Sequence, residues 1–405
     1  MRVLFVNPGA TLGGSERSLL DVFASLQAGV PDVTARLLLF ADGELAVRAR
    51  GLGVGTDVVP LPPRLALLGD SGADLRGLVA RLPSFLRAGI DAVGHGARLR
   101  SVVRAFAPDV VHTNGMKAHL LMPVVAPEVP RVVHLRDFAS ERPVGPFALP
   151  LLARGSIIVT NSRAVEADAR RLAPRSRTAV VYNGIDLTEF SPGARDPRHL
   201  AELANMQVPE PDTIIVGMLA TYAWWKGHRT FLHAAARVLA SAPELNFRFY
   251  VVGGPIYARA GSEVTESELR RTAAELGLGN VVGFVPFQPE PAAAYRGLDV
   301  VVHPSERPEP FGRTIVEAMA CERAVIAARG GGAVELFSEG ESALGHAPGD
   351  AADLATAIVR LARDEALRTR LGRAARAEAE ARFDRRRLGA EVRAVYGDLL
   401  AERLR

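Results

Sequence analysis

The feature that most constrains the fold is a repeated alternation of short β-branched or aliphatic runs with longer segments of helical periodicity. In the first half of the chain these runs span residues 2–6, 34–40, 109–113, 131–135, 156–161 and 178–184. Short apolar runs separated by helical segments are typical of a parallel sheet covered by helices on both faces. The first half therefore predicts a doubly wound α/β domain.

A polar, proline-containing stretch at residues 190–212 interrupts this pattern, which then starts again. The second series of runs spans residues 213–219, 247–254, 281–285, 299–305 and 323–328, and from about residue 350 the pattern is helical. A chain of 405 residues is longer than one compact core usually holds. We therefore predict an α/β protein of two Rossmann-like doubly wound domains, residues 1–192 and 212–383. A linker (193–211) joins them, and a C-terminal helix (384–405) is expected to pack back on the first domain.

Composition excludes several classes of protein. The chain carries 49 Lys+Arg against 45 Asp+Glu, a near balance that does not favour nucleic-acid binding. The single cysteine, Cys321, excludes an internal disulfide framework and a cysteine zinc cluster, which suits a reducing cytoplasm. No apolar run approaches the ~20 residues that a membrane span needs. We expect a cytoplasmic protein whose membrane contact, if it has one, is peripheral at the inner face.

The stretch "PEPFGRTIVEAMA" at residues 308–320 holds two carboxylates in different settings. Pro310 biases Glu309 toward an extended conformation, so Glu309 is expected to precede the helix that contains Glu317. Gly312 allows the backbone to approach a ligand, and free amides at the start of the following helix can meet an anion. Taken alone, the stretch could equally be a polar loop that leads into an ordinary surface helix.

The segment "DVVVHPSERPEPFGRTIVEAMACERAVIAARGGGAVEL" (299–336) resembles the retaining glycosyltransferase family 4 in both the order and the spacing of its motifs. Four further segments are similar to the same family: "GGSERSLLDVF" (13–23), "VVYNGIDLTEFSP" (180–192), "WKGHRTFL" (225–232) and "NVVGFVPF" (280–287). The resemblance covers nearly the whole chain. It implies the GT-B architecture, with an active site in the cleft between the two domains.

The resemblance also implies roles for individual residues. A nucleoside diphosphate leaving group gains negative charge as the glycosidic bond breaks, so the site must supply positive charge and backbone donors. Lys226 matches the basic phosphate contact, Glu309 the residue beside the hydroxyls of the transferred sugar, and Glu317 the ribose ligand. The other donor-binding residues that it implies are Gly13, Gly14, Thr221, Phe284, Val285, Pro310, Phe311, Gly312, Arg313 and Thr314. Backbone amides of residues 328–335 are expected near the diphosphate.

His134 matches a histidine that the family places near the reacting centre, so the catalytic set implied by the resemblance is His134, Glu309 and Lys226. Polar residues at the ends of first-domain strands are candidates for the acceptor site, namely His112, Asn114, Arg136 and Asp137. Each of these could equally be a structural residue at the end of a strand. Retention without an obvious nucleophile leaves the general base unassigned.

Thr221 departs from the family pattern, which has an arginine at this position. A charge-assisted contact between an arginine and a phosphate contributes about 1.5–3 kcal/mol. Either Arg313 or Arg17 compensates for it, or the donor is held differently, or the chain is a non-catalytic homologue that binds nucleotide sugar.

The substrates expected from the resemblance are a nucleoside diphosphate sugar, with a UDP-sugar favoured and GDP-mannose next, and a small-molecule, lipid-linked or glycan acceptor. We expect no cofactor and no metal, because the chain has no Asp-x-Asp motif and no close His/Cys pair at zinc-ligand spacing. High Ala, Arg and Gly usage suggests a bacterial source, and either cell-envelope glycan or natural-product biosynthesis. A sugar-nucleotide epimerase on the same scaffold is the competing enzyme class. The amphipathic stretch 64–104 could lie against a membrane, line an acceptor site, or form ordinary surface helices.

Overall fold

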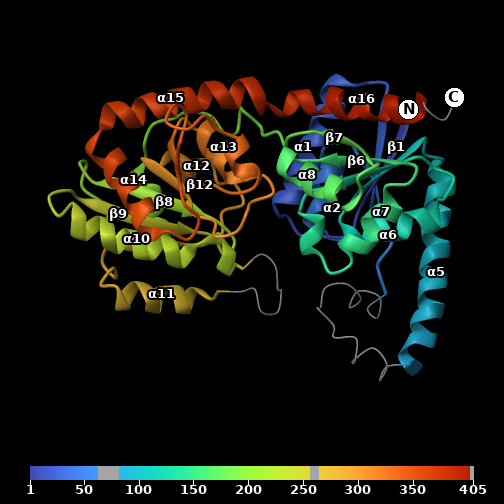
Figure 1. The fold of residues 1–405 in the computed structure, drawn as a ribbon, viewed down its shortest axis with the longest axis horizontal. Coiled ribbons are helices and arrows are strands. Elements are labelled where there is room, and N and C mark those ends of the chain that lie inside the picture. The colour runs from blue at the N-terminus through green and yellow to red at the C-terminus, as the bar shows by residue number, and fades with distance from the viewer. Residues whose placement is uncertain (63–81, 256–263, 402–405) are drawn as a thin grey trace. The chain divides into compact units, whose positions relative to one another are not determined.

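The computed structural model describes residues 1–62, 82–255 and 264–401 (Figure 1). It consists of two compact units. Unit 1 comprises Met1–Gly184 together with Arg385–Arg405, and unit 2 comprises Ile185–Asp384. The predicted stretch 64–104 falls partly outside the described residues, so the amphipathic interpretation of its first part stays a prediction.

Unit 1 is built on a seven-stranded parallel sheet with the order β3-β2-β1-β4-β5-β6-β7. Its strands are β1 (Arg2–Asn7), β2 (Thr34–Leu39), β3 (Gly55–Val58), β4 (Val110–Asn114), β5 (Arg131–Leu135), β6 (Ser156–Thr160) and β7 (Arg177–Val180). The six predicted strands of this half are present. The prediction missed β3, because this short edge strand, "GTDV", is only half-buried and lacks an apolar run.

Helices cover both faces of this sheet, as the apolar runs predict. They are α1 (Gly14–Gly29), α2 (Glu44–Gly51), α5 (Leu82–Phe106), α6 (Met116–Val125), α7 (Gly145–Leu152), α8 (Arg163–Leu172) and α16 (Leu388–Ala401), with 3-10 turns η1 (Ala139–Glu141) and η4 (Arg385–Arg387). Neighbouring strand residues point to opposite faces: Val132 packs in the core beneath α1, α2 and α16, whereas Val133 packs in the core beneath α7 and α8. Both sides of the sheet are therefore buried.

The C-terminal helix α16 lies beside α1 in unit 1 (Figure 1). Val392, Tyr396 and Leu399 are buried in the same core cluster as Phe5 and the apolar face of α1. The hydroxyl of Ser25 accepts a 2.8 Å hydrogen bond from the amide of Gly389 and so fixes the start of α16 against α1. Residues at the end of the chain thereby become part of the core formed by its beginning.

Unit 2 contains a six-stranded parallel sheet with the order β10-β9-β8-β11-β12-β13. Its strands are β8 (Ile214–Leu219), β9 (Phe247–Val252), β10 (Val282–Val285), β11 (Val300–His303), β12 (Ala324–Ala328) and β13 (Leu344–His346). Its helices are α9 (Pro197–Leu203), α10 (His228–Ser241), α11 (Glu266–Glu275), α12 (Ala292–Arg296), α13 (Arg313–Ala320), α14 (Ala351–Arg363) and α15 (Glu365–Arg382), with 3-10 turns η2 (Trp224–Lys226) and η3 (Gly332–Glu335). The five predicted strands are present, and the three-residue β13 was missed. Two doubly wound parallel α/β units confirm the predicted fold class.

The unit boundaries differ from the predicted domain boundaries. Residues 193–211, which we predicted to be a linker, lie inside unit 2 and contain α9. Asp196 caps this helix by accepting a hydrogen bond from the amide of Arg198, and Pro197 occupies its first turn. Proline is well tolerated at the first helical position because that position needs no amide donor, so a proline that looked like a chain break instead begins a helix.

None of the described helices is both long enough and apolar enough to cross a membrane.

Candidate functional site

Each sheet has one position where the order of strands reverses, between β1 and β4 in unit 1 and between β8 and β11 in unit 2. In open α/β sheets, ligands bind beside the carboxyl ends of the strands at such a position. The predicted residues of unit 1 follow β1 and end β4, at Gly13 and Asn114. Those of unit 2 follow β8 and β11, at Lys226 and Glu309. The topology thus places the predicted residues of each unit where a ligand is expected.

Lys226 is positioned by a tight turn between β8 and α10. It ends the 3-10 turn η2, and the next residue, Gly227, has a φ of 77°. A Cβ at Gly227 would lie 1.8 Å from the carbonyl oxygen of Pro304, so only glycine fits this close approach. The turn therefore brings the β8 loop against the loop that follows β11 and carries Glu309.

Lys226 and Glu309 form an ion pair in unit 2. The Lys226 ammonium donates to both carboxylate oxygens of Glu309, at 2.8 Å and 2.9 Å. The Ser305 hydroxyl donates a third hydrogen bond to the Glu309 carboxylate at 3.0 Å, and His303 Nε2 lies 3.5 Å from the same oxygen. Both members of the pair are largely buried, with side chains 21% and 14% exposed. The structure thus joins two of the three predicted catalytic residues.

The environment of Glu309 favours its ionised form. Burial alone would raise the pKa of its carboxyl group, but the charge of Lys226, with hydrogen bonds from His303 and Lys226, lowers this pKa well below the usual range. Glu309 is therefore a carboxylate at neutral pH. It can accept hydrogen bonds from hydroxyl groups, but it does not carry a proton to give away.

The backbone around Glu309 has the predicted order of loop followed by helix. Glu309 pairs with Gly331 in an isolated parallel bridge, and the amide of Gly332 donates to the Glu309 carbonyl oxygen at 2.7 Å. Gly312 is the N-cap of α13 with a φ of 101°. A Cβ at Gly331 would lie 2.4 Å from the Glu309 carbonyl oxygen, so the glycine-rich turn can pack directly on the loop.

Glu317, on the first turns of α13, is 4% exposed and held by two donors. The phenol of Tyr295 donates to it at 2.8 Å, and the guanidinium of Arg313 donates at 2.7 Å. Burial, followed by the charge of Glu317, raises the pKa of Tyr295 well above its usual range, so the phenol stays protonated and keeps this bond. Arg313, one of the two candidates to replace an arginine at position 221, is engaged by Glu317.

The other predicted donor residues differ in how open they are. The Thr221 hydroxyl donates to the carbonyl oxygen of Gly254 at 3.2 Å. Phe284 and Val285 are core side chains, 5% and 0% exposed, and Arg270 lies 4.7 Å from the Phe284 ring centroid. Phe311 is buried 6.0 Å from the ring of Phe383. Besides Lys226 and Glu309, the partly exposed donor residues of unit 2 are Thr221, Pro310, Arg313 and Thr314.

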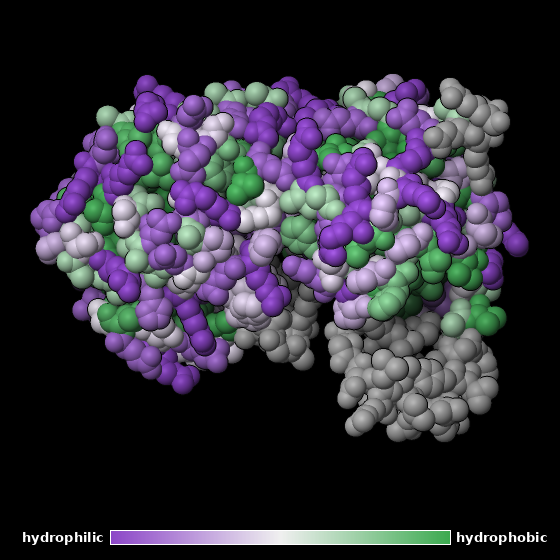
Figure 2. Space-filling model, in the orientation of Figure 1, coloured by the Kyte–Doolittle hydropathy of each residue, from purple (hydrophilic) through white to green (hydrophobic). Residues whose placement is uncertain are grey.

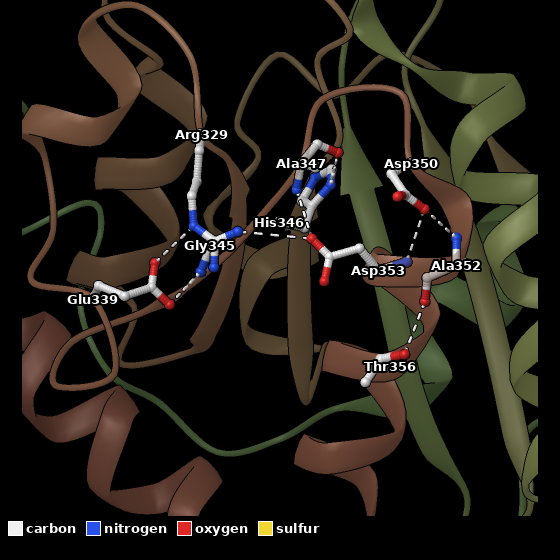
Figure 3. Close-up of polar contacts among 9 residues, drawn as sticks. All are labelled: Arg329, Glu339, Gly345, His346, Ala347, Asp350, Ala352, Asp353 and Thr356. Carbon is white, nitrogen blue, oxygen red and sulfur yellow. Dashed lines mark hydrogen bonds and ion pairs between the residues drawn. The ribbon is translucent and has the colours of Figure 1, made fainter.

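A polar network anchors the glycine-rich turn after β12 (Figure 3). Arg329 lies between Glu339 at 3.3 Å and Asp353 at 3.7 Å. The carboxylate of Asp353 also accepts the amide of Ala347 at 2.7 Å, which ties β13 to the start of α14. Arg329 is thus committed to two carboxylates, and the turn offers backbone amides rather than a side-chain cation.

In unit 1, Gly13 is the N-cap of α1. The Glu16 carboxylate accepts the Gly13 amide at 3.2 Å, which orders the first turn. Gly14 is exposed, and a Cβ at this position would meet nothing within 4 Å. There is therefore open space beside Gly14, the first residue of α1.

His134 lies in a chain of three buried rings that the sequence did not predict. His112 Nε2 lies 3.0 Å from His134 Nδ1, and His112 Nδ1 lies 2.7 Å from the Tyr396 hydroxyl. Burial is the main cause that lowers the pKa of both histidines well below the ordinary value, helped by the nearby charge of Arg136. Burial also raises the pKa of Tyr396. All three rings are therefore neutral at physiological pH.

The remaining acceptor candidates separate into two groups. Arg136 donates to the side-chain oxygen of Asn114 at 3.3 Å and to that of Asn183 at 2.8 Å. Asp137 pairs with Arg142 in an exposed loop. The side chain that hydrogen-bonds to His134 in the structure is that of His112. Arg136 and Asn114 thus lie together at the ends of β4 and β5.

Sequence reasoning missed four residues of these constellations: His303, Ser305, Tyr295 and Tyr396. His303 and Ser305 had a usable signal, since they end a predicted strand six and four residues before Glu309, respectively. Tyr295 and Tyr396 had none, because each lies on a separate helix and meets its partner only through tertiary packing.

No group of three His, Cys, Asp or Glu side chains arranged to hold a metal ion occurs among residues 1–62, 82–255 and 264–401. Metal independence stays a prediction.

Proteins with similar sequences show which family this chain belongs to. Two of them are D-inositol 3-phosphate glycosyltransferases, from Streptomyces bingchenggensis (strain BCW-1) and Acidothermus cellulolyticus (strain ATCC 43068 / DSM 8971 / 11B). The first is 37% identical over 55% of this chain and 48% of its own length, and the second is 36% identical over 62% and 55%. The matches thus span about half the length of these relatives.

Solved structures with the same fold include Anabaena HepE in complex with UDP and glucose, and sucrose-phosphate synthase from Thermosynechococcus elongatus. The TM-scores are 0.78 and 0.76, at 24% and 20% identity, with 98% and 99% of this chain covered and 99% and 100% of those chains. Structural neighbours of this kind are GT-B glycosyltransferases. The family model "Glycosyltransferase Family 4" matches residues 13–189, and "Glycosyl transferases group 1" matches residues 202–378. The chain, matched in both of its units, therefore belongs to the group 1 family of glycosyl transferases and has the GT-B fold.

Proposed function

We propose that the protein is a retaining, metal-independent glycosyltransferase that moves a sugar from a nucleoside diphosphate sugar to an acceptor hydroxyl. The observation that carries this proposal is the buried Lys226–Glu309 ion pair beside the strand-order reversal of unit 2. A cation for the leaving diphosphate and an ionised acceptor for sugar hydroxyls are the two groups that this transfer needs. They occur here within hydrogen-bonding distance of each other.

The ion pair also suggests how the nucleotide-sugar donor would bind in the site. Lys226 and Glu309 neutralise each other in the absence of substrate. A bound diphosphate competes for the lysine ammonium, and Glu309 then turns its oxygens to the hydroxyls of the transferred sugar. Glu317 takes the ribose, with its orientation held by Tyr295 and Arg313. Amides of the turn anchored through Arg329 face the phosphates.

We favour a UDP-sugar as the donor, with GDP-mannose next. The neighbour HepE forms complexes with UDP and with UDP-glucose, which supports this order without assigning the base in this chain. Titration calorimetry with UDP, GDP and ADP tests it: tight binding of one diphosphate to the folded protein is expected. Absence of binding for all three would sink the proposal.

The acceptor is proposed to be a small-molecule, lipid-linked or glycan hydroxyl in bacterial cell-envelope or natural-product biosynthesis. Inositol phosphates belong among the acceptors to be tested, because two of the relatives are D-inositol 3-phosphate glycosyltransferases. A donor-by-acceptor screen analysed by mass spectrometry identifies the product. Incubation without acceptor separates the transferase from an epimerase, since only an epimerase accumulates a rearranged sugar nucleotide. A non-catalytic homologue, suggested by Thr221, would bind nucleotide sugar without any turnover in either assay.

We also propose a peripheral contact of unit 1 with an anionic membrane surface at the cytoplasmic side. Two neighbouring helices expose large apolar side chains: Leu120 and Val124 on α6, and Phe147 and Leu151 on α7, with the exposed N-cap residue Val144 before α7. Figure 2 shows hydrophobic side chains gathered over this part of unit 1. Residues 92–106, 116–125 and 145–152 contain no Asp or Glu, whereas Arg98, Arg100, Arg104 and Lys117 lie among them. Exposed apolar side chains on segments that carry positive but no negative charges fit anionic lipid headgroups.

Vesicle flotation tests this contact. The protein is expected to float with vesicles of phosphatidylglycerol and phosphatidylcholine, and less with phosphatidylcholine alone. Phe147→Ser with Leu151→Ser is expected to weaken flotation, whereas Val47→Ser, at another exposed position of unit 1, is the control. Equal flotation of the double variant and the parent would contradict the contact.

A further inference from the structure

The chain Tyr396–His112–His134 determines which nitrogen of His134 carries a proton. Because both imidazoles are neutral, each has one N–H and one lone pair. The Tyr396 phenol has one proton to donate. Two arrangements of protons satisfy both observed hydrogen bonds, and they differ in what remains unpaired.

In the first arrangement the Tyr396 hydroxyl donates to His112 Nδ1, and His112 Nε2–H donates to His134 Nδ1. His134 then carries its proton on Nε2. The only unpaired group is this N–H, because His134 Nε2 is buried and has no hydrogen-bond partner in the described part of the chain.

In the second arrangement all donors are reversed. His134 Nδ1–H donates to His112, whose Nδ1–H donates to the Tyr396 oxygen. The phenol proton must then point elsewhere, in a site where Tyr396 is 0% exposed and His112 is its hydrogen-bond partner. Two buried polar groups are left unpaired instead of one, and each such group costs about 1–3 kcal/mol.

The surroundings lock the rings in place. Phe5 stacks on His112 with ring centroids 4.8 Å apart and an interplanar angle of 27°. Tyr396 lies on α16, which is packed into the unit 1 core. The charge of Arg136 acts on both imidazoles and disfavours a second proton on either ring. No carboxylate is available to reverse the direction of the bonds among the side chains that contact these rings.

We infer that His134 is a hydrogen-bond donor through Nε2, held in that tautomer by Tyr396 and His112 as positioning residues, and is not the general base of the reaction. This inference rests on the proposed function for its kinetic consequence. The His134 Nε2–H group would donate a hydrogen bond to an oxygen atom of the bound substrate. A base would need a lone pair on Nε2, which the first arrangement does not provide.

The tautomer can be measured directly in the intact protein by long-range ¹H–¹⁵N correlation spectroscopy with ¹⁵N-labelled histidine. His134 is expected to show a protonated Nε2 and an unprotonated Nδ1. His119 is an internal reference of opposite type: the Thr113 hydroxyl donates to the Val132 carbonyl oxygen, so His119 Nδ1 must supply the proton of its 2.7 Å bond to Thr113. A protonated Nδ1 on His134 would overturn the inference, whether or not the protein has any transferase activity.

Tyr396→Phe removes the donor that sets the direction of the chain. Both tautomers of His134 are expected in this variant, with the His119 signals unchanged. Tyr250→Phe is the matched control, because the Tyr250 hydroxyl is buried in unit 2 and has no hydrogen-bond partner among the residues that the structure describes. An unchanged His134 tautomer in folded Tyr396→Phe would show that Tyr396 is not a positioning residue, and the wild-type spectrum still decides the donor role.

Kinetic measurements on His134 variants distinguish a hydrogen-bond donor from a general base. Glutamine can donate a hydrogen bond but cannot accept a proton at neutral pH, so His134→Gln is expected to keep kcat within about tenfold of the parent, whereas His134→Leu loses about a hundredfold. If the two variants lose kcat equally, the donor role is wrong. If the parent turns over no donor, the proposed function fails while the spectroscopic result on the tautomer stands.

Discussion

The two units of the molecule meet the same topological requirement with opposite chemistry. At the carboxyl ends of its strands, unit 1 buries a chain of neutral rings, Tyr396, His112 and His134. The corresponding region of unit 2 buries charges in pairs, Lys226 with Glu309 and Arg313 with Glu317. Isolated charges are too costly to bury, so unit 1 neutralises its groups by shifting their pKa values and unit 2 neutralises its groups with partners. The same physical penalty therefore has two solutions in one chain.

The largest expected effect comes from breaking the ion pair of unit 2. Lys226→Met is expected to reduce kcat/KM about 10²- to 10³-fold, because the leaving diphosphate loses its cation. It also leaves Glu309 buried without its main partner, which costs about 3–5 kcal/mol of unfolding free energy. Urea unfolding and turnover of the donor measure the two effects.

The double variant Lys226→Met with Glu309→Gln is the control for this experiment. It removes the buried charge as well as its partner, so most of the lost stability should return while activity does not. If stability stays low in the double variant, the charge of Glu309 is not what Lys226 balances.

The second expected effect concerns donor affinity. Glu317→Gln keeps an oxygen that can accept from Tyr295 but loses the charge that Arg313 contacts. It also loses the charge that we propose for binding a ribose hydroxyl. We expect the KM for the donor to rise about 10- to 100-fold with a smaller change in kcat, since hydrogen bonds to charged groups contribute about 1.5–3 kcal/mol. Glu365→Gln, at an exposed position on α15, is the control. A change confined to kcat would assign Glu317 another role.

The third prediction compares the neutral histidines of the two units by pH. Burial lowers the pKa of His119 to about 3 and that of His228 to about 4, both below the ordinary value of about 6.5. Below pH 6.5 these histidines bind protons in the unfolded chain but stay neutral in the folded protein. The free energy of unfolding therefore falls as the pH falls. Each histidine contributes up to about 1.4 kcal/mol per pH unit.

His119→Gln should reduce the pH dependence of the stability of unit 1 between pH 6.5 and about pH 3. His228→Gln should reduce that of unit 2 only between pH 6.5 and about pH 4. Trp224 and Trp225 both lie in unit 2, so their fluorescence reports that unit. Hydrogen exchange of β4 and β5 peptides reports unit 1. Equal pH slopes in parent and variants would mean that these rings titrate normally.

The smallest expected effect is on UDP binding, when a positive charge is added to unit 2. Thr221→Arg adds the cation that the family pattern has at this position, so binding of UDP is expected to tighten by up to about tenfold. Thr221→Val, which removes the hydroxyl bond to Gly254, should change affinity less than about threefold. Calorimetry distinguishes these variants, and weaker binding by Thr221→Arg would mean that the site excludes a guanidinium here.

Local periodicity and turn chemistry were enough to predict eleven of the thirteen strands in the two sheets and the change from loop to helix at Gly312. The runs are buried on both sides, so they are nearly continuous in apolar residues and easy to recognise. The short strands β3 and β13 and helix α9 were missed, since their residues gain burial only from neighbours. The pattern around Glu309 identified the loop, but not its contacts with Ser305 and His303.

The sequence by itself determined the doubly wound fold, the family, and the residue types that a nucleotide-sugar site needs, because these depend on period, spacing and local backbone preference. Only the tertiary structure decided the partners of those residues. Lys226 meets Glu309, 83 positions away, and His112 meets Tyr396, 284 positions away. Such pairs form because the core brings separate strands and helices together, and the partner then decides whether a buried group is charged or neutral.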